Sequence, residues 1–179
     1  MSWKEKEDQK NENNKKKCSF LLGELKQEDL DRGFLETLNS LIAETSKKLD
    51  RSKAESIFQE IESNPLHKIF VVYAVGQEDN KGCSNAVDNK KVIVGTTTLL
   101  VEPKFIFGGG RVGHIEDVSV RKEFQGLGIG SWLVEHATTV AESVMGCVKI
   151  VLDCSDETMP FYQRLGYSYQ DNCMVKKKV

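Results

Sequence analysis

Apolar residues recur at helical spacing in the first third of the chain. Residues 29–49 carry them every three or four positions, which predicts one amphipathic helix. A second helix is predicted to begin in a capping box at residues 52–55, and Asn64-Pro65 ends it. The apolar positions are Leu30, Phe34, Leu38, Leu41, Ile42 and Leu49 in the first helix, and Ile57, Phe58 and Ile61 in the second.

From residue 69 onward the pattern changes to runs rich in β-branched residues, which are typical of strands. Two further helices interrupt these runs, at residues 128–145 and at residues 157–165, where Gly166 suits a helix C-terminus. Residues 77–91 form a long polar connection. The order of elements predicts an α/β (α+β mixed) fold, with a mixed sheet and helices on both faces. The predicted strands are residues 19–25, 69–75, 92–101, 114–120, 149–154 and 167–175.

The length of 179 residues and the hydrophobic fraction of 39% are ordinary for one globular domain. That domain is expected over residues 18–179, because residues 1–17 are nearly devoid of apolar groups and are predicted to be disordered. No apolar run reaches the roughly 18 residues of a membrane span, and no signal-peptide core is seen at the N-terminus. A cytoplasmic protein is therefore expected.

Charge and cysteine usage narrow the classes of partner. The formal net charge is −2, which does not favour nucleic acid as a partner. The five cysteines show no Cys-x-x-Cys pairing and no metal-ligand spacing. Free thiols and no bound metal are therefore expected.

The stretch Gln-Gly-Leu-Gly-Ile-Gly-Ser at 125–131 holds three glycines at alternate positions, between a predicted strand and a predicted helix. A glycine loop that opens a helix presents bare backbone N–H groups and the positive end of the helix dipole. The sequence therefore predicts a loop that binds phosphate groups.

The spacing of the glycines restricts the ligand of this loop. No lysine stands where a Walker loop requires one, and Gly-x-Gly-x-Gly differs from the dinucleotide fingerprint Gly-x-Gly-x-x-Gly. A glycine-rich turn without any ligand stays open on the loop alone. Arg121 precedes the loop, where it can either serve the phosphate charge or lie on the solvated surface.

Gln125-x-x-Gly128-x-Gly130 resembles the Gln/Arg-x-x-Gly-x-Gly/Ala signature of the GNAT acetyltransferases, and the predicted order of elements is also similar to theirs. This resemblance implies a central mixed, mostly antiparallel twisted sheet with helices on both faces. Three blocks look like eukaryotic glucosamine 6-phosphate N-acetyltransferases over residues 104–179. They are Gly-His-Ile-Glu-Asp-Val at 113–118, Gly-Cys-x-Lys-Ile-x-Leu-Asp-Cys at 146–154 and Phe-Tyr-x-x-x-Gly-Tyr at 161–167.

The resemblance implies acetyl transfer from acetyl-CoA to the 2-amine of D-glucosamine 6-phosphate. The products are N-acetylglucosamine 6-phosphate and CoA, in a step of UDP-N-acetylglucosamine biosynthesis, by direct transfer in a ternary complex without a metal. The alternative is a GNAT enzyme that acetylates a protein or another small amine. A silent acetyl-CoA-binding module is a third interpretation, which the presence of Gln125, Gly128, Gly130 and Tyr162 disfavours.

The resemblance also implies the cofactor site. The loop backbone is expected to cradle the CoA pyrophosphate, and the preceding strand to line the pantetheine arm, with the Val118 N–H polarising the thioester carbonyl. The implied cofactor-binding residues are Val118, Ser119, Val120, Gln125, Gly126, Leu127, Gly128, Ile129, Gly130, Ser131, Asp153 and Tyr162.

Three residues are implied as catalytic. The amine must lose a proton and the leaving thiolate needs one, so Glu116 is the candidate acceptor and Tyr162 the candidate donor. Asp153 is expected to hold the amine. Glu116 as a turn cap and Tyr162 as a buried core residue remain open alternatives. Glu116 and Asp117 are adjacent in a strand and are expected to face opposite sides.

The sugar site is implied by the same resemblance, in a homodimer to which both subunits contribute sugar contacts. Lys177 stands nearest to the family's C-terminal arginine, whose bidentate fork a lysine cannot reproduce. Phe107 stands where the family often has histidine. Ile42 stands where the family has threonine, with Thr45 a turn later. The implied substrate-binding residues are Lys104, Phe105, Ile106, Phe107, Glu116, Asp117, Val118, Val148, Lys149 and Lys177.

Overall fold

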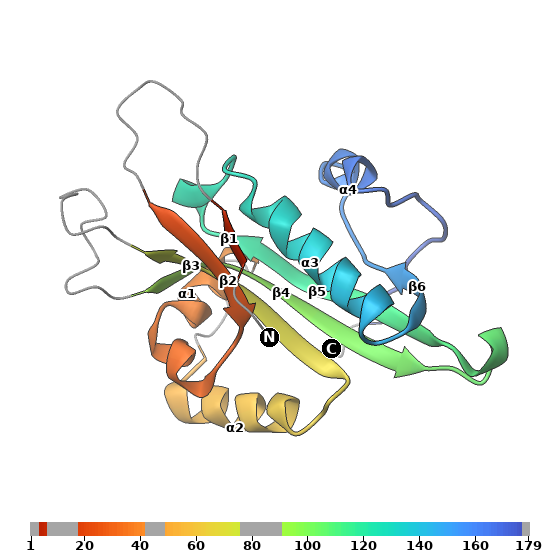
Figure 1. Ribbon diagram of the computed structural model, residues 1–179, viewed down its shortest axis with the longest axis horizontal. Coiled ribbons are helices and arrows are strands. Elements are labelled where there is room, and N and C mark those ends of the chain that lie inside the picture. Colours follow the sequence, from red (N-terminus) through yellow and green to blue (C-terminus); the bar gives the residue numbers. More distant parts are fainter. Residues whose placement is uncertain (1–3, 7–17, 42–48, 76–90, 177–179) are drawn as a thin grey trace.

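Six strands form one sheet in the order β1-β2-β3-β4-β5-β6 (Figure 1). This computed structural model describes residues 4–6, 18–41, 49–75 and 91–176. Neighbouring strands from β1 to β5 pair antiparallel, and β6 pairs parallel with β5. The mixed, mostly antiparallel sheet predicted from the sequence is therefore confirmed. The strands are β1 Lys4–Lys6, β2 Ser19–Glu24, β3 His67–Val75, β4 Val92–Pro103, β5 Arg111–Val120 and β6 Cys147–Val151.

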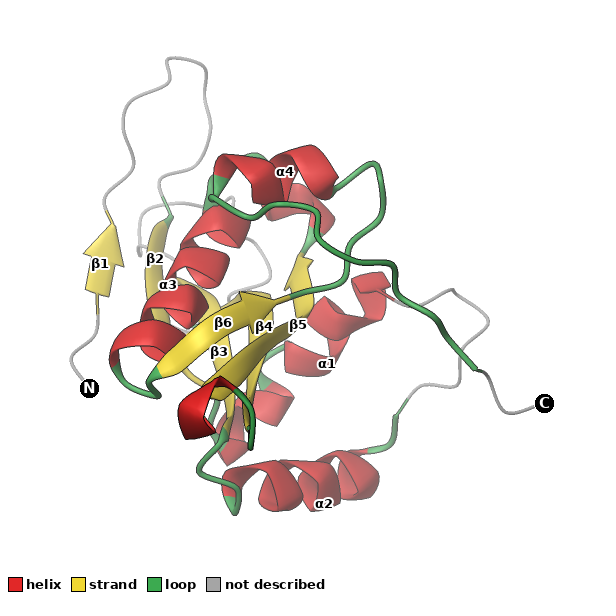
Figure 2. Ribbon diagram, turned by 90° about the vertical axis from the view of Figure 1, so that its right-hand side faces the viewer, coloured by secondary structure: helices red, strands yellow, loops and turns green. Residues whose placement is uncertain are grey.

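Helices cover both faces of this sheet (Figure 2). On one face, Trp132 and Leu133 of α3 join a core with residues of β3, β4 and β5. On the other face, Phe34 of α1 and Phe58 of α2 belong to a second core, which contains Ile93 of β4. The α-helices are α1 Phe34–Leu38, α2 Arg51–Glu62, α3 Ile129–Ser143 and α4 Met159–Arg164, and the 3₁₀ helices are η1 Gln27–Asp31, η2 Asn39–Leu41, η3 Phe107–Gly109 and η4 Lys122–Phe124.

The single helix predicted over residues 29–49 is wrong. Its first part is divided into η1, α1 and η2, and residues 42–48 lie outside the described residues. Gly33, between η1 and α1, has φ 89°, whereas a right-handed helix requires φ near −60°. The chain turns at Gly33, yet Leu30 and Phe34 still reach the same core. Helical spacing alone does not reveal such a turn, because it reports only which side chains are buried.

The predicted capping box at residues 52–55 is also wrong. The N-cap of α2 is Asp50, whose carboxylate accepts a hydrogen bond from the Lys53 backbone N–H at 2.9 Å. Aspartate satisfies the unpaired donors of a helix start as well as serine does. The helix ends at Glu62, before Asn64-Pro65, as predicted.

Both ends of the chain differ from expectation. Residues 4–6 form the edge strand β1, so the prediction that residues 1–17 are disordered is wrong for these three residues. The described residues from 167 to 176 contain no strand, so the last strand predicted at 167–175 is wrong. Most of these side chains are exposed, and a strand needs a paired neighbour for its backbone groups. The polar connection at 77–91 falls almost wholly outside the described residues.

The cysteines are in two states. Cys18 is disulfide-bonded, so the expectation of free thiols is wrong at this residue. Cys147, Cys154 and Cys173 are free. Across the described residues, no helix combines the length and the apolar character that crossing a membrane requires.

Candidate active site

β5 and β6 run side by side for only part of their length. Their parallel register ends where His114 lies opposite Val151. On that edge of β5, the backbone groups of residues 115–120 have no strand partner among the described residues. An unpaired strand edge can hold an extended ligand as though it were an added strand. This edge therefore suits the linear arm of a cofactor such as acetyl-CoA.

A bulge lies in the part of β5 that pairs with β4 but not with β6. Its register with β4 shifts at Thr97, where Asp117 and Val118 are inserted opposite one residue. Asp117 has φ 52°, in the left-handed region that only bulges and turns normally require of such a residue. The regular alternation on which opposite faces for Glu116 and Asp117 were predicted is interrupted here. Both carboxylates are exposed at this point.

The glycine loop is tied to the end of β5. The side-chain amide of Gln125 donates a hydrogen bond to the carbonyl of Val120 at 3.0 Å. Gly126 and Gly128 have φ 80° and 76°, and a Cβ atom added to either would meet nothing within 4 Å. Both glycines therefore serve the backbone conformation, and the space outside the loop is open.

The N-terminus of α3 carries no side-chain cap. Its N-cap is Gly128, which makes no side-chain hydrogen bond. The first backbone N–H groups of a helix lack intrahelical acceptors, and the helix dipole adds positive potential there. Leu127 and both neighbouring glycines are exposed. The loop and the helix start together offer unpaired backbone donors and positive potential to an anion such as a phosphate group.

Gly130 links the loop to α4. A Cβ atom added to Gly130 would lie 3.5 Å from the ring of Phe161 in α4. The Phe161 ring packs edge-on against Tyr162, with centroids 4.9 Å apart. The start of α3 and the candidate acid Tyr162 are therefore held by one set of contacts.

Tyr162 is half-buried in a cluster of aromatic rings. Its centroid lies 6.2 Å from that of Tyr167, whose hydroxyl is 2.6 Å from the hydroxyl of Thr138. Burial raises the pKa of Tyr162, and Cys154 and Tyr167 raise it further. The phenol therefore keeps its proton at neutral pH. Its hydroxyl has no hydrogen-bond partner in the part of the chain that the structure describes, so the proton is available to a substrate.

Glu116 and Asp153 lie within electrostatic reach of each other. Partial burial raises the pKa of Glu116 although its side chain stays open to solvent, the charges of Asp153 and Asp117 raise it further, and His114 opposes them. A carboxylate with a raised pKa is a better proton acceptor near neutral pH. The thiol of Cys173 donates to Asp153 Oδ2 at 3.4 Å. Cys173 was not expected here, because no spacing in the sequence connects the two residues.

The segment that follows β6 connects the candidate catalytic groups. Asp153 interacts with Glu116, and the adjacent Cys154 interacts with Tyr162. Glu116 and Tyr162 therefore each interact with one of two adjacent residues, 153 and 154, and no direct contact between Glu116 and Tyr162 is found in the part of the chain that the structure describes. The site can combine a proton acceptor, a proton donor and an open anion-binding loop.

The β5 residues expected to bind the cofactor point in different directions. Val118 and Val120 pack toward the core beneath α3. Ser119 is buried, and its hydroxyl donates to the carbonyl of Thr37 in α1 at 2.6 Å. Only the backbone of Ser119 therefore remains for a cofactor. Arg121 also turns toward α1, and this was not foreseen.

Lys104 lies at the far end of β5 from the carboxylates. Pro103 pairs with Arg111, and Arg111 precedes Glu116 by five residues, or about 16 Å along a strand. Lys104 Nζ forms an ion pair with Glu102 at 2.5 Å. The same Glu102 oxygen lies 3.2 Å from His114 Nε2, so the Lys104 side chain reaches back along the sheet toward the residue that stands two positions before Glu116. Among the described residues, Lys104 makes no ion pair with Glu116 or Asp153.

The connection from β4 to β5 exposes a run of apolar side chains. The exposed fractions of Phe105, Ile106 and Phe107 are 108%, 62% and 55%. Val148 at the start of β6 is 61% exposed, and Lys149 beside it is half-buried. Contiguous exposed apolar groups usually mark a contact surface.

Some predicted site residues cannot be located. Lys177 lies outside the described residues, as do Ile42 and Thr45. Within the described ranges, no group of three histidine, cysteine or acidic side chains is placed to hold a metal ion.

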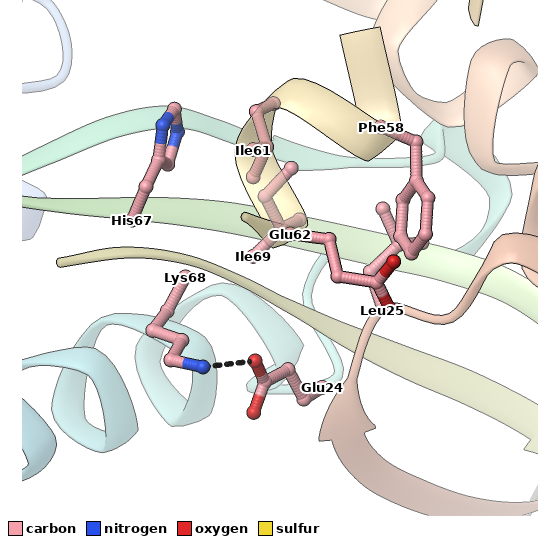
Figure 3. Close-up of a pocket in the computed structure, with 8 residues that line it drawn as sticks. All are labelled: Glu24, Leu25, Phe58, Ile61, Glu62, His67, Lys68 and Ile69. Carbon is pink, nitrogen blue, oxygen red and sulfur yellow. Dashed lines mark hydrogen bonds and ion pairs between the residues drawn. The ribbon is translucent and has the colours of Figure 1, made fainter. Parts of the chain in front are cut away.

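A shallow groove beside α2 is separate from the candidate active site (Figure 3). Lys68 Nζ and Glu24 form an ion pair there at 2.8 Å. Burial lowers the pKa of His67 in the same groove. The groove contains no residue that the sequence assigns to the acetyl-transfer site. Its lining consists of Glu24, Leu25, Phe58, Ile61, Glu62, His67, Lys68 and Ile69.

Comparison with known proteins finds relatives and a solved structure that are similar to this chain over most of its length. A glucosamine 6-phosphate N-acetyltransferase of Candida albicans is 36% identical over 150 residues, which are 83% of this chain and 89% of the relative. One from Trypanosoma brucei brucei is 42% identical over 82 residues, 46% of this chain and 55% of that relative. The crystal structure of glucosamine-6-phosphate N-acetyltransferase from Arabidopsis thaliana aligns with a TM-score of 0.73 at 33% identity, covering 88% of this chain and 97% of that one.

The family assignment rests on a wider match. The model of the acetyltransferase (GNAT) family matches residues 35–167, which include the bulge, the glycine loop and α4. Because this match takes in well over half of the chain, the protein belongs to the acetyltransferase (GNAT) family.

Proposed function

We propose that the protein transfers the acetyl group of acetyl-CoA to the 2-amine of D-glucosamine 6-phosphate, in the cytoplasm and as a step of UDP-N-acetylglucosamine biosynthesis. The observation that carries the proposal is the unpaired edge of β5, which bears Glu116, together with the open glycine loop and the uncapped N-terminus of α3. Curated relatives with this activity in their names cover most of the chain.

The chain's own residues supply each part of the reaction. The loop backbone at 126–131 binds the pyrophosphate of acetyl-CoA, and the Val118 N–H donates to the thioester carbonyl. Glu116 accepts the amine proton, directly or through water, while Asp153 orients the amine. The Tyr162 hydroxyl donates its proton to the departing thiolate. Both substrates bind at once, so the transfer is direct and proceeds in a ternary complex.

An acceptor panel tests this proposal. Purified full-length protein is mixed with acetyl-CoA, and thiol release is followed with glucosamine 6-phosphate, glucosamine, and lysine-containing peptides. Release is expected with glucosamine 6-phosphate. The kcat/KM with glucosamine should be at least about a hundredfold lower, because glucosamine has no phosphate and therefore leaves the cationic groups of the site unpaired. Release with a peptide or another amine, and none with the sugar phosphate at millimolar concentration, would instead support a GNAT enzyme of different specificity.

The raised pKa of Glu116 predicts a measurable titration. Because burial and the charge of Asp153 both raise this pKa, Glu116 becomes protonated on acidification before an ordinary glutamate does. Replacing Asp153 with asparagine removes one of the charges and is expected to move the midpoint to lower pH. Carboxyl-carbon NMR of the free protein measures the midpoint in both forms.

Asp156→Asn is the matched control for this titration. Asp156 is also an exposed acid after β6, but it is not among the groups that shift Glu116. A Glu116 midpoint that moves equally in both variants, or in neither, would remove the carboxylate pair from the mechanism.

We further propose that the active form is a homodimer whose sugar site is shared between subunits. The support is the β4–β5 connection that carries Lys104, because three consecutive apolar side chains are exposed there. A second copy can bring this connection to the neighbouring site.

Phe105→Ser is expected to weaken the dimer at least tenfold, because loss of an aromatic anchor at the centre of an interface costs about 2 kcal/mol. Sedimentation velocity over a concentration series measures the change. Val144→Ser is the control, because Val144 is 60% exposed at the end of α3 and lies outside the connection. A monomeric wild type, or equal weakening by both changes, would contradict the shared site.

A further inference from the structure

A buried network joins α1 to the end of β5. Thr37 in α1 is completely buried, and its hydroxyl lies 2.9 Å from the Gly33 carbonyl and 3.0 Å from the Ile93 carbonyl. The same hydroxyl accepts a hydrogen bond from Arg121 Nε at 3.0 Å. Arg121 Nη2 donates to the Gly33 carbonyl at 2.7 Å. One guanidinium therefore bonds to both ends of the first turn of α1.

Ser119 extends this network toward the reacting groups. Its hydroxyl donates to the Thr37 carbonyl at 2.6 Å and lies 2.5 Å from the hydroxyl of Ser40 in η2. Ser119 follows the bulge residue Asp117 by two positions. The network thus holds α1 and η2 against the stretch of β5 that carries Glu116.

The side chains on the two faces of β5 contact different helices. Val118 and Val120 point toward the core beneath α3, the helix whose open N-terminus faces the cofactor loop. Ser119 and Arg121 bond instead to α1, on the opposite face of the sheet (Figure 2). A change at Arg121 should therefore disturb the side of β5 nearer to α1 and leave the cofactor loop in place.

We propose that Arg121 is a positioning residue for the acceptor amine. Its guanidinium fixes α1 and η2 against the β5 bulge, and this sets the place of the Glu116 and Asp117 carboxylates relative to the acceptor. The catalytic part of this inference rests on the proposed acetyl transfer. Arg121 acts through α1 and does not bind the phosphates of acetyl-CoA.

Arg121→Lys is the decisive variant, because lysine keeps the charge but cannot reach two acceptors with a planar fork. It is expected to raise the KM for the acceptor amine roughly tenfold, which is less than the hundredfold that a misplacement of about 1 Å can cost. The dissociation constant for CoA should stay within about twofold of the wild type. Amide hydrogen exchange in residues 34–41 should speed up, while exchange in α3 should not.

Two more variants complete the design. Ser119→Ala removes the second connection to α1 without a change of charge, and the same split between acceptor and CoA is expected. Lys122→Gln is the control, because it removes an adjacent exposed positive charge that has no part in the network. Its exchange rates and its acceptor KM are expected to match those of the wild type.

Each outcome decides the proposal. A further variant, Arg121→Gln, removes the charge of this side chain. Weaker CoA binding in Arg121→Gln, with normal binding in Arg121→Lys, would show a phosphate contact and overturn the proposal. Faster exchange in residues 34–41 with an unchanged acceptor KM would leave Arg121 a purely structural role and also overturn it. If the wild type acetylates no amino-sugar phosphate, the proposed function fails, and the KM is then measured with whichever amine in the panel is acetylated. Unchanged amide hydrogen exchange of residues 34–41 in Arg121→Lys would show that Arg121 does not hold α1 in place, whichever amine is acetylated.

Discussion

Replacing Tyr162 with phenylalanine is expected to lower kcat by about a hundredfold, the lower end of what positioned acid catalysis contributes. This corresponds to about 2.7 kcal/mol of transition-state stabilisation. Burial raises the pKa of Tyr162, so the wild-type phenol stays protonated up to alkaline pH and can protonate the thiolate throughout the neutral range. Phenylalanine keeps the ring contacts with Phe161 and Tyr167 but has no proton to donate. Single-turnover measurement of thiol release, with CoA binding measured separately, isolates the chemical step.

Tyr167→Phe is the matched control for this experiment. Tyr167 belongs to the same aromatic cluster and burial also raises its pKa, but its hydroxyl is engaged with Thr138. Its loss should lower the melting temperature and leave the chemical step close to that of the wild type. An unchanged single-turnover rate in Tyr162→Phe would assign Tyr162 to the core and leave the thiolate without an identified acid.

Replacing Gly128 with valine is expected to weaken acetyl-CoA binding by at least a hundredfold. Gly128 has φ 76°, a conformation that a β-branched residue rarely adopts, so the backbone N–H groups at the start of α3 should shift. Loss of two hydrogen bonds to a charged phosphate, at about 1.5 kcal/mol each, amounts to about 3 kcal/mol. Isothermal titration calorimetry with CoA measures the effect directly.

Gly146→Val separates the loss of binding from general strain. Gly146 follows the other end of α3, has φ 68°, and also has open space where a Cβ atom would be added. Both variants should lose a similar amount of stability in thermal unfolding, because both force valine into the left-handed region. Only Gly128→Val should lose CoA affinity, and normal affinity in that variant would show that the loop is not the phosphate cradle.

The glycine loop and its flanking elements could be predicted from the sequence because their causes are local. Gln125, Gly128 and Gly130 lie within six residues, and the strand before them and the helix after them have clear periods. The predicted limits of the strands that correspond to β2–β6 lie within three residues of the observed limits for the same reason, because runs of β-branched residues indicate buried strands. These parts of the fold depend on local secondary-structure preferences, which a single sequence is enough to reveal.

The predictions of other elements were wrong because those elements depend on residues that are distant in the sequence. At the break, the Gly33 carbonyl accepts a hydrogen bond from the guanidinium of Arg121, which is 88 residues away in the sequence. A strand at 167–175 would need a partner edge, and alternating apolar letters do not supply one. The bulge at Asp117 likewise depends on pairing with β4 and leaves no periodic signal.

The sequence by itself determined the mixed sheet, the phosphate-binding loop and the family to which they belong, because each depends on contiguous residues with fixed spacing. Only the tertiary structure decided which groups meet. It placed Asp153 within electrostatic reach of Glu116, formed the bulge at Asp117, and turned Ser119 and Arg121 toward α1. Such contacts between distant residues depend on strand pairing and burial across the whole domain, and they cannot be predicted from the spacing of residues along the chain.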